Sequence, residues 1–171
     1  SRAESSSLVY GTREVRDLMH ALRAVADRSD EHALVTALRT TMFGCSDVEL
    51  YAYRRAGGRW DHQRRLPDGL AADDPVAVGI ALLGRLHRRV PWSTPAELLD
   101  ELIEARRVME LGALEERPRD VWRRIRFVVD QARAWHEVTG GTLRGYLAWV
   151  AGQSAEGVRV IESVLPETDD D

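Results

Sequence analysis

The chain has 171 residues, of which 44% are apolar and 30% are charged, values that indicate one globular domain and exclude a disordered chain. It holds no apolar run of the roughly 18 residues that suggest a membrane span and no signal-peptide pattern, so we expect a cytoplasmic protein without a membrane partner. The single cysteine, Cys45, excludes an internal disulfide and fits a reducing compartment.

The formal net charge of −4 does not by itself suggest a nucleic-acid partner, but the distribution of charge changes that interpretation. Four acidic residues lie in the C-terminal tail, and without them the rest of the chain is near neutral: Glu167, Asp169, Asp170 and Asp171. All 24 basic residues are arginine. One explanation for the lack of lysine is a GC-rich genome. The other is a preference for bidentate contacts between arginine and phosphate.

Apolar residues recur at helical spacing along most of the chain, which predicts an all-α fold, an orthogonal bundle of about seven helices. The first predicted helix begins after Thr12 and the second after Ser29 or Asp30, with Gly44 ending the second. A third helix begins at Ser46, which opens a capping-box pattern, and runs to about residue 55.

Glycine, proline and charged residues over positions 57–74 predict a long loop, with Trp60 pinned to the core. A fourth helix then begins at Pro75, where proline suits the first helical position. A fifth follows the capping-box pattern that opens at Thr94, and the longest helix begins at Pro118.

The pattern of the C-terminal part of the chain predicts one more helix. Gly140 and Gly141 end the longest helix, and Thr142 caps a last one that runs to about residue 150. Two short apolar segments, residues 7–10 and 158–160, are the candidates for extended structure. We therefore expect at most one or two short terminal strands beside the helices.

The sequence offers no constellation that predicts catalysis, a bound cofactor or a metal site. A Walker-type phosphate loop needs a lysine, and the chain has none. The five histidines are scattered without zinc-ligand spacing, so we interpret each as a surface or partly buried side chain. Cys45 fits a small buried residue better than a reactive thiol. Carboxylates cluster on one predicted helix near two arginines, as on a solvated face: Asp100, Glu101 and Glu104.

The longest predicted helix carries a row of arginines on its polar side: Arg119, Arg123, Arg126 and Arg133. One interpretation is a solvated face, in which Asp120 and Asp130 are the i,i+4 partners of Arg124 and Arg126. The other interpretation is contact with phosphates along a duplex, where each arginine adds affinity without base specificity.

The junction between the second and third predicted helices combines a glycine, three hydroxyl side chains and the free amides of a helix N-terminus. Such an arrangement favours a phosphate group, because unpaired N–H groups and the helix dipole both attract negative charge. It predicts a nucleic-acid-binding site made of Arg39, Thr40, Thr41, Gly44 and Ser46.

Several segments resemble UvrD/Rep-type superfamily-one DNA helicases, and the RecB- and AddA-like branch most closely. Residues 14–17 read E-V-R-D and are followed by Leu22-Arg23, as in the family's segment after the fourth helicase motif. Residues 37–50 read A-L-R-T-T-M-F-G-C-S-D-V-E-L, which is similar to A-L-R-S-P-L-F-G-L-S-D-D-E-L of RecB-like members. Residues 143–149, followed by the C-terminal tail, resemble the run before motif V.

The resemblance implies an internal fragment of an ATP-dependent DNA helicase of repair or recombination. Residues 1–28 would be the edge of the second RecA-like domain (2A), residues 29–156 a helical 2B-like domain, and residues 157–171 a linker to motif V. The fragment would engage duplex DNA near the fork and regulate unwinding, while ATP and Mg bind elsewhere in the parent. Its partners would be DNA and the remaining helicase domains.

Three further hypotheses about function remain open from the residues alone. A nuclease domain or a partner subunit in the parent is one extension of the helicase hypothesis. A stand-alone helical protein-interaction or regulatory domain is the main alternative to it. A small all-α enzyme is the third hypothesis, and no motif in the chain favours it.

Overall fold

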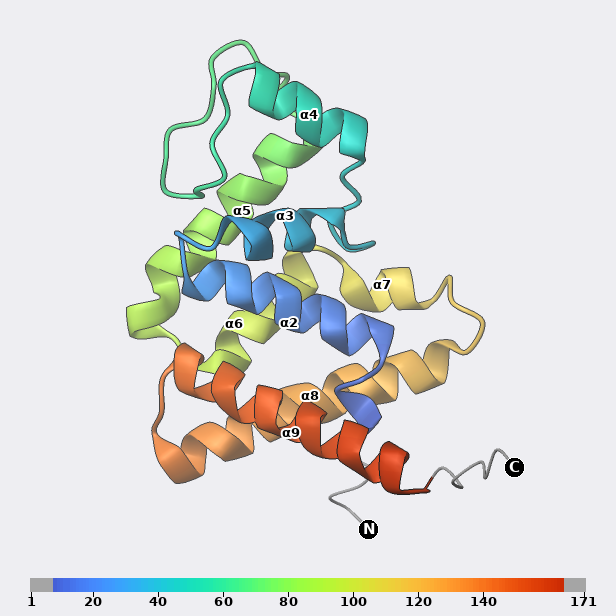
Figure 1. Ribbon diagram of the computed structural model, residues 1–171. Coiled ribbons are helices and arrows are strands. Elements are labelled where there is room, and N and C mark those ends of the chain that lie inside the picture. The colour runs from blue at the N-terminus through green and yellow to red at the C-terminus, as the bar shows by residue number, and fades with distance from the viewer. Residues whose placement is uncertain (1–7, 165–171) are drawn as a thin grey trace, which may run out of the picture.

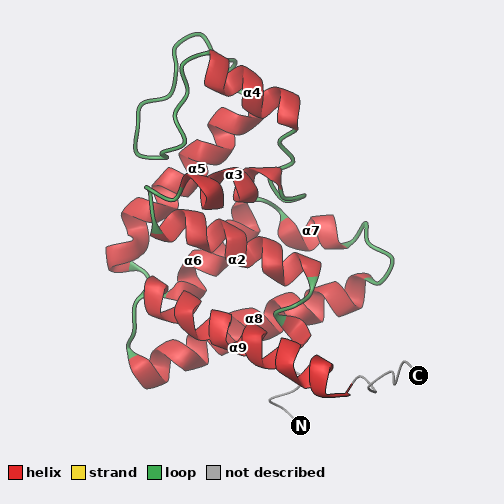
Figure 2. Ribbon diagram, in the orientation of Figure 1, coloured by secondary structure: helices red, strands yellow, loops and turns green. Residues whose placement is uncertain are grey.

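The computed structural model describes the backbone of residues 8–164 and the side chains of residues 8–155 (Figure 1). The predicted all-α class is confirmed, because the described residues form helices and loops and no strand (Figure 2). Within this range the eight α-helices and one 3₁₀ helix are α2 (Arg13–Ala26), α3 (Glu31–Arg39), α4 (Asp47–Arg55), α5 (Pro75–Arg89), η1 (Val90–Trp92), α6 (Pro95–Ala105), α7 (Val108–Gly112), α8 (Pro118–Thr139) and α9 (Leu143–Val164).

Most helices begin where the sequence predicts. The Asp30 carboxylate accepts a hydrogen bond from the Ala33 amide at the start of α3. Capping boxes are formed at Ser46 for α4 and at Thr94 for α6, each closing two amides that the first turn leaves unpaired. Pro75 opens α5, where proline loses no intrahelical hydrogen bond.

Three local predictions need correction. Thr12 precedes α2, but its hydroxyl donates to the Val9 carbonyl at 2.7 Å and caps no amide. Residues 8 and 9 are helical rather than extended, and Ser7 lies outside the described residues. Residues 158–160 are also helical, because α9 continues to Val164 with no proline before Pro166 to stop it.

The hydrophobic core is one cluster of side chains that extends in sequence from Tyr10 to Val150. Helix α2 lies in the middle of the bundle, among the other helices (Figure 1). The apolar side chains of α2 are almost completely buried, and α2 packs against α3, α5, α8 and α9. The proposed division after residue 28 stays a prediction. On the described residues, however, α2 and α3 belong to one core, and no second core separates them.

The predicted long loop connects α4 to α5 at one end of the molecule (Figure 2). Trp60 is partly buried against the core and its ring lies 5.5 Å from the ring of Tyr53, which confirms that it pins the loop. In the part of the chain that the structure describes, every helix is too short or too polar to cross a membrane.

Candidate nucleic-acid interface

The predicted site at the α3–α4 junction is a tight turn closed by its own backbone. The Gly44 amide donates to the Thr40 carbonyl at 2.7 Å, and the Cys45 amide reaches back to the Leu38 carbonyl at 3.0 Å. Gly44 has a φ of +65°, in the left-handed region, so a glycine is favoured at this position. The turn therefore fixes the directions of the side chains that were predicted to bind a phosphate.

Thr40 is not an exposed phosphate ligand, because only 8% of the residue is accessible. Its hydroxyl donates to the Ala37 carbonyl at 2.7 Å, an interaction inside the last turn of α3. Threonine hydroxyls compete for nearby carbonyls in this way at helix ends. The sequence places Thr40 in the junction, but only the fold shows that its side chain points inward.

The remaining predicted residues are exposed, and most have partners within the chain. The Nε atom of Arg39 lies 3.2 Å from the Asp47 carboxylate, and the Ser46 hydroxyl accepts from the Glu49 amide. Arg13 donates to the Thr41 hydroxyl at 3.4 Å. Asp47 and Glu49 are acidic and lie in the first turn of α4, where they already complement the helix dipole and weaken the attraction for a phosphate.

The sequence analysis did not predict the contacts between this turn and the residue that follows α6. The guanidinium group of Arg106, just after α6, donates from Nε to the Met42 carbonyl at 3.0 Å. The same group lies 4.9 Å from the centre of the Phe43 ring, within cation–π range. Arg106 is 64 residues away from Met42 along the chain, so no local pattern could have indicated the contact.

A cavity of about 120 Å³ lies beside the turn, where α2, α7 and α8 converge. Its walls are mainly apolar, with the carboxyl groups of Glu14 and Asp17 on one side. Burial raises the pKa of Asp17 against the opposing effect of the nearby arginines. Glu14 Oε1 lies 2.9 Å from Arg124 Nε, close enough for an ion pair although the two groups are not aligned for a hydrogen bond.

The arginine row of α8 is on the outside of the molecule, as its spacing predicts. The expected i,i+4 partners are wrong. Asp120 lies 3.5 Å from Arg123, Asp130 lies 2.9 Å from Arg133, and Arg124 turns to Glu14. Both ion pairs within α8 therefore have i,i+3 spacing, which also brings two side chains to the same helix face.

Two members of the row, Arg119 and Arg126, have no ion pair with any described acidic side chain. They line a shallow groove with Arg123, the rings of Trp122 and Phe127, and Asp130, whose carboxylate pairs with Arg133. The Trp122 indole donates to the Met109 carbonyl at 2.7 Å, which fixes its ring beside the groove. The groove therefore presents exposed guanidinium groups on a rigid helix.

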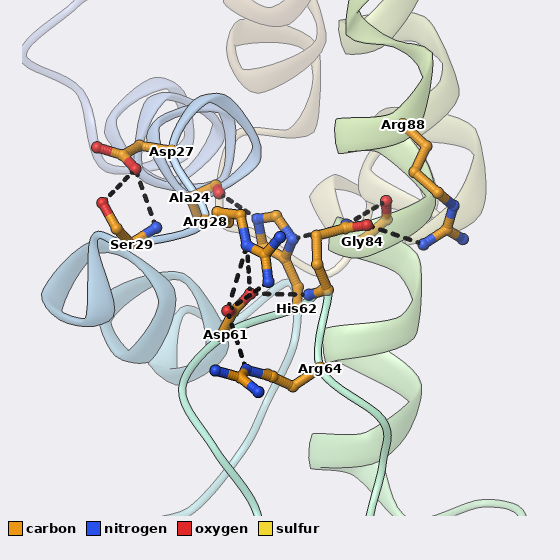
Figure 3. Close-up of polar contacts among 10 residues, drawn as sticks. Ala24, Asp27, Arg28, Ser29, Asp61, His62, Arg64, Gly84 and Arg88 are labelled. Atoms are coloured by element: carbon orange, nitrogen blue, oxygen red, sulfur yellow. Dashed lines mark hydrogen bonds and ion pairs between the residues drawn. The ribbon is translucent and has the colours of Figure 1, made fainter.

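A separate polar cluster holds the C-terminal end of α2 to the long loop and to α5 (Figure 3). The His62 Nε2 atom donates to the Ala24 carbonyl at 2.7 Å, and Arg28 forms a bidentate ion pair with Asp61. His87 donates from Nδ1 to the Val25 carbonyl at 2.6 Å. These contacts satisfy carbonyl groups that a helix end leaves unpaired, so the cluster is structural.

His62 is buried, which corrects the interpretation that it is a surface or partly buried side chain, and its ring lies 4.9 Å from the ring of His87. Burial lowers the pKa of His62, and His87 and Arg28 nearby lower it further against the opposing Ala24 hydrogen bond. The His62 imidazole is therefore neutral, with Nδ1 accepting from the Gln63 amide at 3.0 Å.

Cys45 is buried, as expected, and burial raises the pKa of its thiol to about 11. A protonated, buried thiol is a poor nucleophile. Among the described side chains, no group of three or more His, Cys, Asp or Glu residues is placed to hold a metal ion.

A search against known protein families found none that matches this chain, and a search of curated proteins found no match either.

Proposed function

We propose that this chain is a duplex-engaging, regulatory helical part of an ATP-dependent DNA helicase of the UvrD/Rep type. The sequence resemblance over residues 14–17 and 37–50 supports the family. The all-α fold agrees with the helical 2B-like domain that the resemblance implies. In this proposal the fragment binds DNA, and the parent's other domains bind ATP and Mg and carry out catalysis.

The observation that carries the proposal is the exposed arginine groove of α8. Arg119 and Arg126 are seven residues apart, so they lie about 10 Å apart along the helix, with Arg123 between them on the same face. Neither outer guanidinium is neutralised by a described acid. A phosphate backbone neutralises such groups and releases its own counterions, which is the main source of sequence-independent DNA affinity.

The α3–α4 turn is the second contact in this proposal, through its exposed residues alone. Arg39 and Thr41 point outward, and the Arg39–Asp47 ion pair is solvent-exposed. An exposed ion pair contributes only about 0–1 kcal/mol, so a phosphate can compete for the guanidinium group. Thr40 takes no part, because it is buried.

Fluorescence anisotropy with a labelled DNA duplex tests the proposal at ~50 mM salt, where phosphate contacts dominate. Replacing the three groove arginines with glutamine should weaken binding by roughly 100-fold, at about 1 kcal/mol for each of the three lost contacts. The matched control replaces three exposed arginines that have acidic partners elsewhere, Arg64, Arg65 and Arg85. Equal losses in the two triple variants, or no duplex binding, would contradict the proposal.

One observation favours the alternative, a stand-alone protein-interaction domain. The side chain of Leu114 is 84% exposed and lies at the edge of the apolar cavity beside the turn. The parent reading frame separates the two functions. A phosphate-loop lysine motif upstream and a T-I-H-x-x-K-G-L-E-F-like segment downstream support the helicase, and a frame without them supports the alternative.

A further inference from the structure

The outer face of α4 carries an exposed aromatic ring between an apolar and a basic residue. Val48 is 77% exposed and Tyr51 is 65% exposed, while Leu50 and Tyr53 point into the core. The spacing from Val48 to Tyr51 and on to Arg55 places the three side chains on one helix face. Of the neighbouring helices, α5 is the one on which α4 mainly packs, and the α4 end of the molecule projects from the rest (Figure 1).

The C-terminal end of α4 and the residues that follow it are basic. Residues 51–60 contain three arginines and no acidic residue. Arg54 donates to the Gly58 carbonyl at 2.9 Å, whereas Arg55 and Arg59 form no ion pair with any described acid. The acids of α4 are in its first turn, where Asp47 pairs with Arg39 and Glu49 closes the capping box.

The Arg55 guanidinium lies 5.9 Å from the centre of the Tyr51 ring, within cation–π distance. Favourable charge at a helix C-terminus accounts for Arg54 and Arg55. It does not account for an aromatic ring left largely in water beside them. Exposed aromatic faces flanked by arginines are the arrangement with which proteins bind unpaired nucleotides, since bases stack on the ring and cations hold the phosphates.

We propose that Tyr51 and Arg55 form a site for single-stranded nucleic acid. An unpaired base stacks on the Tyr51 ring, and Arg55 contacts the adjoining phosphate. The site extends the proposed function, because it rests on nucleic acid as the partner. It differs in its element, α4 instead of α8, and in its ligand, an unpaired strand instead of a duplex.

The test measures anisotropy with a labelled oligothymidylate of about 12 nucleotides, within the usual length of such sites, and with an abasic oligonucleotide of the same length. The wild-type protein should bind the oligothymidylate at least fivefold more tightly. Tyr51→Ala should weaken oligothymidylate binding by about 5- to 150-fold, the range that follows from the loss of one stacked base. The same substitution should leave abasic binding unchanged.

Two matched variants keep the result specific. Tyr51→Phe retains the ring and should bind within about twofold of wild type, because stacking uses the ring and not the hydroxyl. Val48→Ala changes the neighbouring exposed apolar side chain and should have no effect. All three variants are judged on folded protein, since Tyr51 and Val48 are exposed and their variants should melt at the wild-type temperature.

The inference is overturned if the base and abasic oligonucleotides bind equally, or if Tyr51→Ala and Val48→Ala behave alike. A protein partner for this face would give that result. Failure here is distinguishable from failure of the proposed function. Tyr51→Ala should leave duplex affinity intact, and the α8 triple variant should keep its preference for oligothymidylate over the abasic strand.

Discussion

His62 makes the stability of this fold depend on pH. Its pKa is lowered in the folded protein, chiefly by burial, so the unfolded chain binds a proton more readily than the folded chain. The stabilisation is therefore complete above the ordinary histidine pKa of about 6.5 and is lost as the pH falls below it.

We expect the free energy of unfolding of the wild-type protein to drop as the pH falls below about 6.5, measured by denaturant titration. His62→Gln keeps a donor for the Ala24 carbonyl but removes the titrating group, so its profile should be flatter. His20, whose pKa is also lowered by burial, accounts for a residual slope. Equal slopes in wild type and His62→Gln would show that His62 is not the source.

Two buried residues near the α3–α4 turn differ in how well their burial could be predicted from the sequence. Cys45 was predictable as a small buried residue, because a free cysteine usually packs as a small apolar side chain. Thr40 was not, since a threonine at a junction fits either an outward ligand or an inward hydroxyl bonded to its own helix. The two orientations leave the same local pattern, and only packing against the rest of the chain selects one.

Among the elements, the starts of the helices were predicted most successfully from the sequence, because a helix start depends on local chemistry. The starts of α3, α4 and α6 depend on hydrogen bonds between residues three apart, which the sequence displays directly. The short helix α7 begins after Arg107, a non-glycine residue with a φ of +51°. Nothing local predicts such a conformation, because the surrounding structure imposes it.

The contact between α5 and the long loop depends on the absence of a side chain at Gly84. A Cβ atom there would lie 2.4 Å from the His62 carbonyl oxygen, a backbone atom that cannot move aside cheaply. Gly84→Ala should therefore lower the free energy of unfolding by about 1–3 kcal/mol or more, measured by denaturant titration.

The matched control for this substitution is Gly152→Ala in α9, where no heavy atom lies within 4 Å of the added Cβ. Alanine is the better helix former, so this variant should be unchanged or more stable by up to about 1 kcal/mol. Destabilisation of both variants to the same extent would mean that the loss at Gly84 comes from the helix and not from the loop contact.

At the scale of the whole molecule, α2 organises the bundle. Its C-terminal carbonyls accept hydrogen bonds from the long loop, from α5 and from α9, through His62, His87 and Arg144. These partners are 38, 62 and 118 residues away in sequence. The helix class was predictable from periodicity, but this arrangement was not, because it depends on contacts that only the complete fold brings together.

The surface of the molecule separates two basic regions on different elements. The α8 groove offers Arg119, Arg123 and Arg126 on a rigid helix, and the outer face of α4 adds an exposed ring. The predicted site at the α3–α4 turn contributes less than its sequence suggests, since Thr40 is buried and the first turn of α4 is acidic. Duplex engagement in the proposed function therefore depends mainly on α8.

The salt dependence of duplex affinity tests that account most directly. A plot of log affinity against log salt concentration has a slope of about −0.9 for each neutralised phosphate. Replacing Arg119, Arg123 and Arg126 with glutamine should make the slope shallower by about two to three, whereas the Arg64, Arg65 and Arg85 control should keep the wild-type slope. A slope that is the same in all three proteins would contradict phosphate contact by α8.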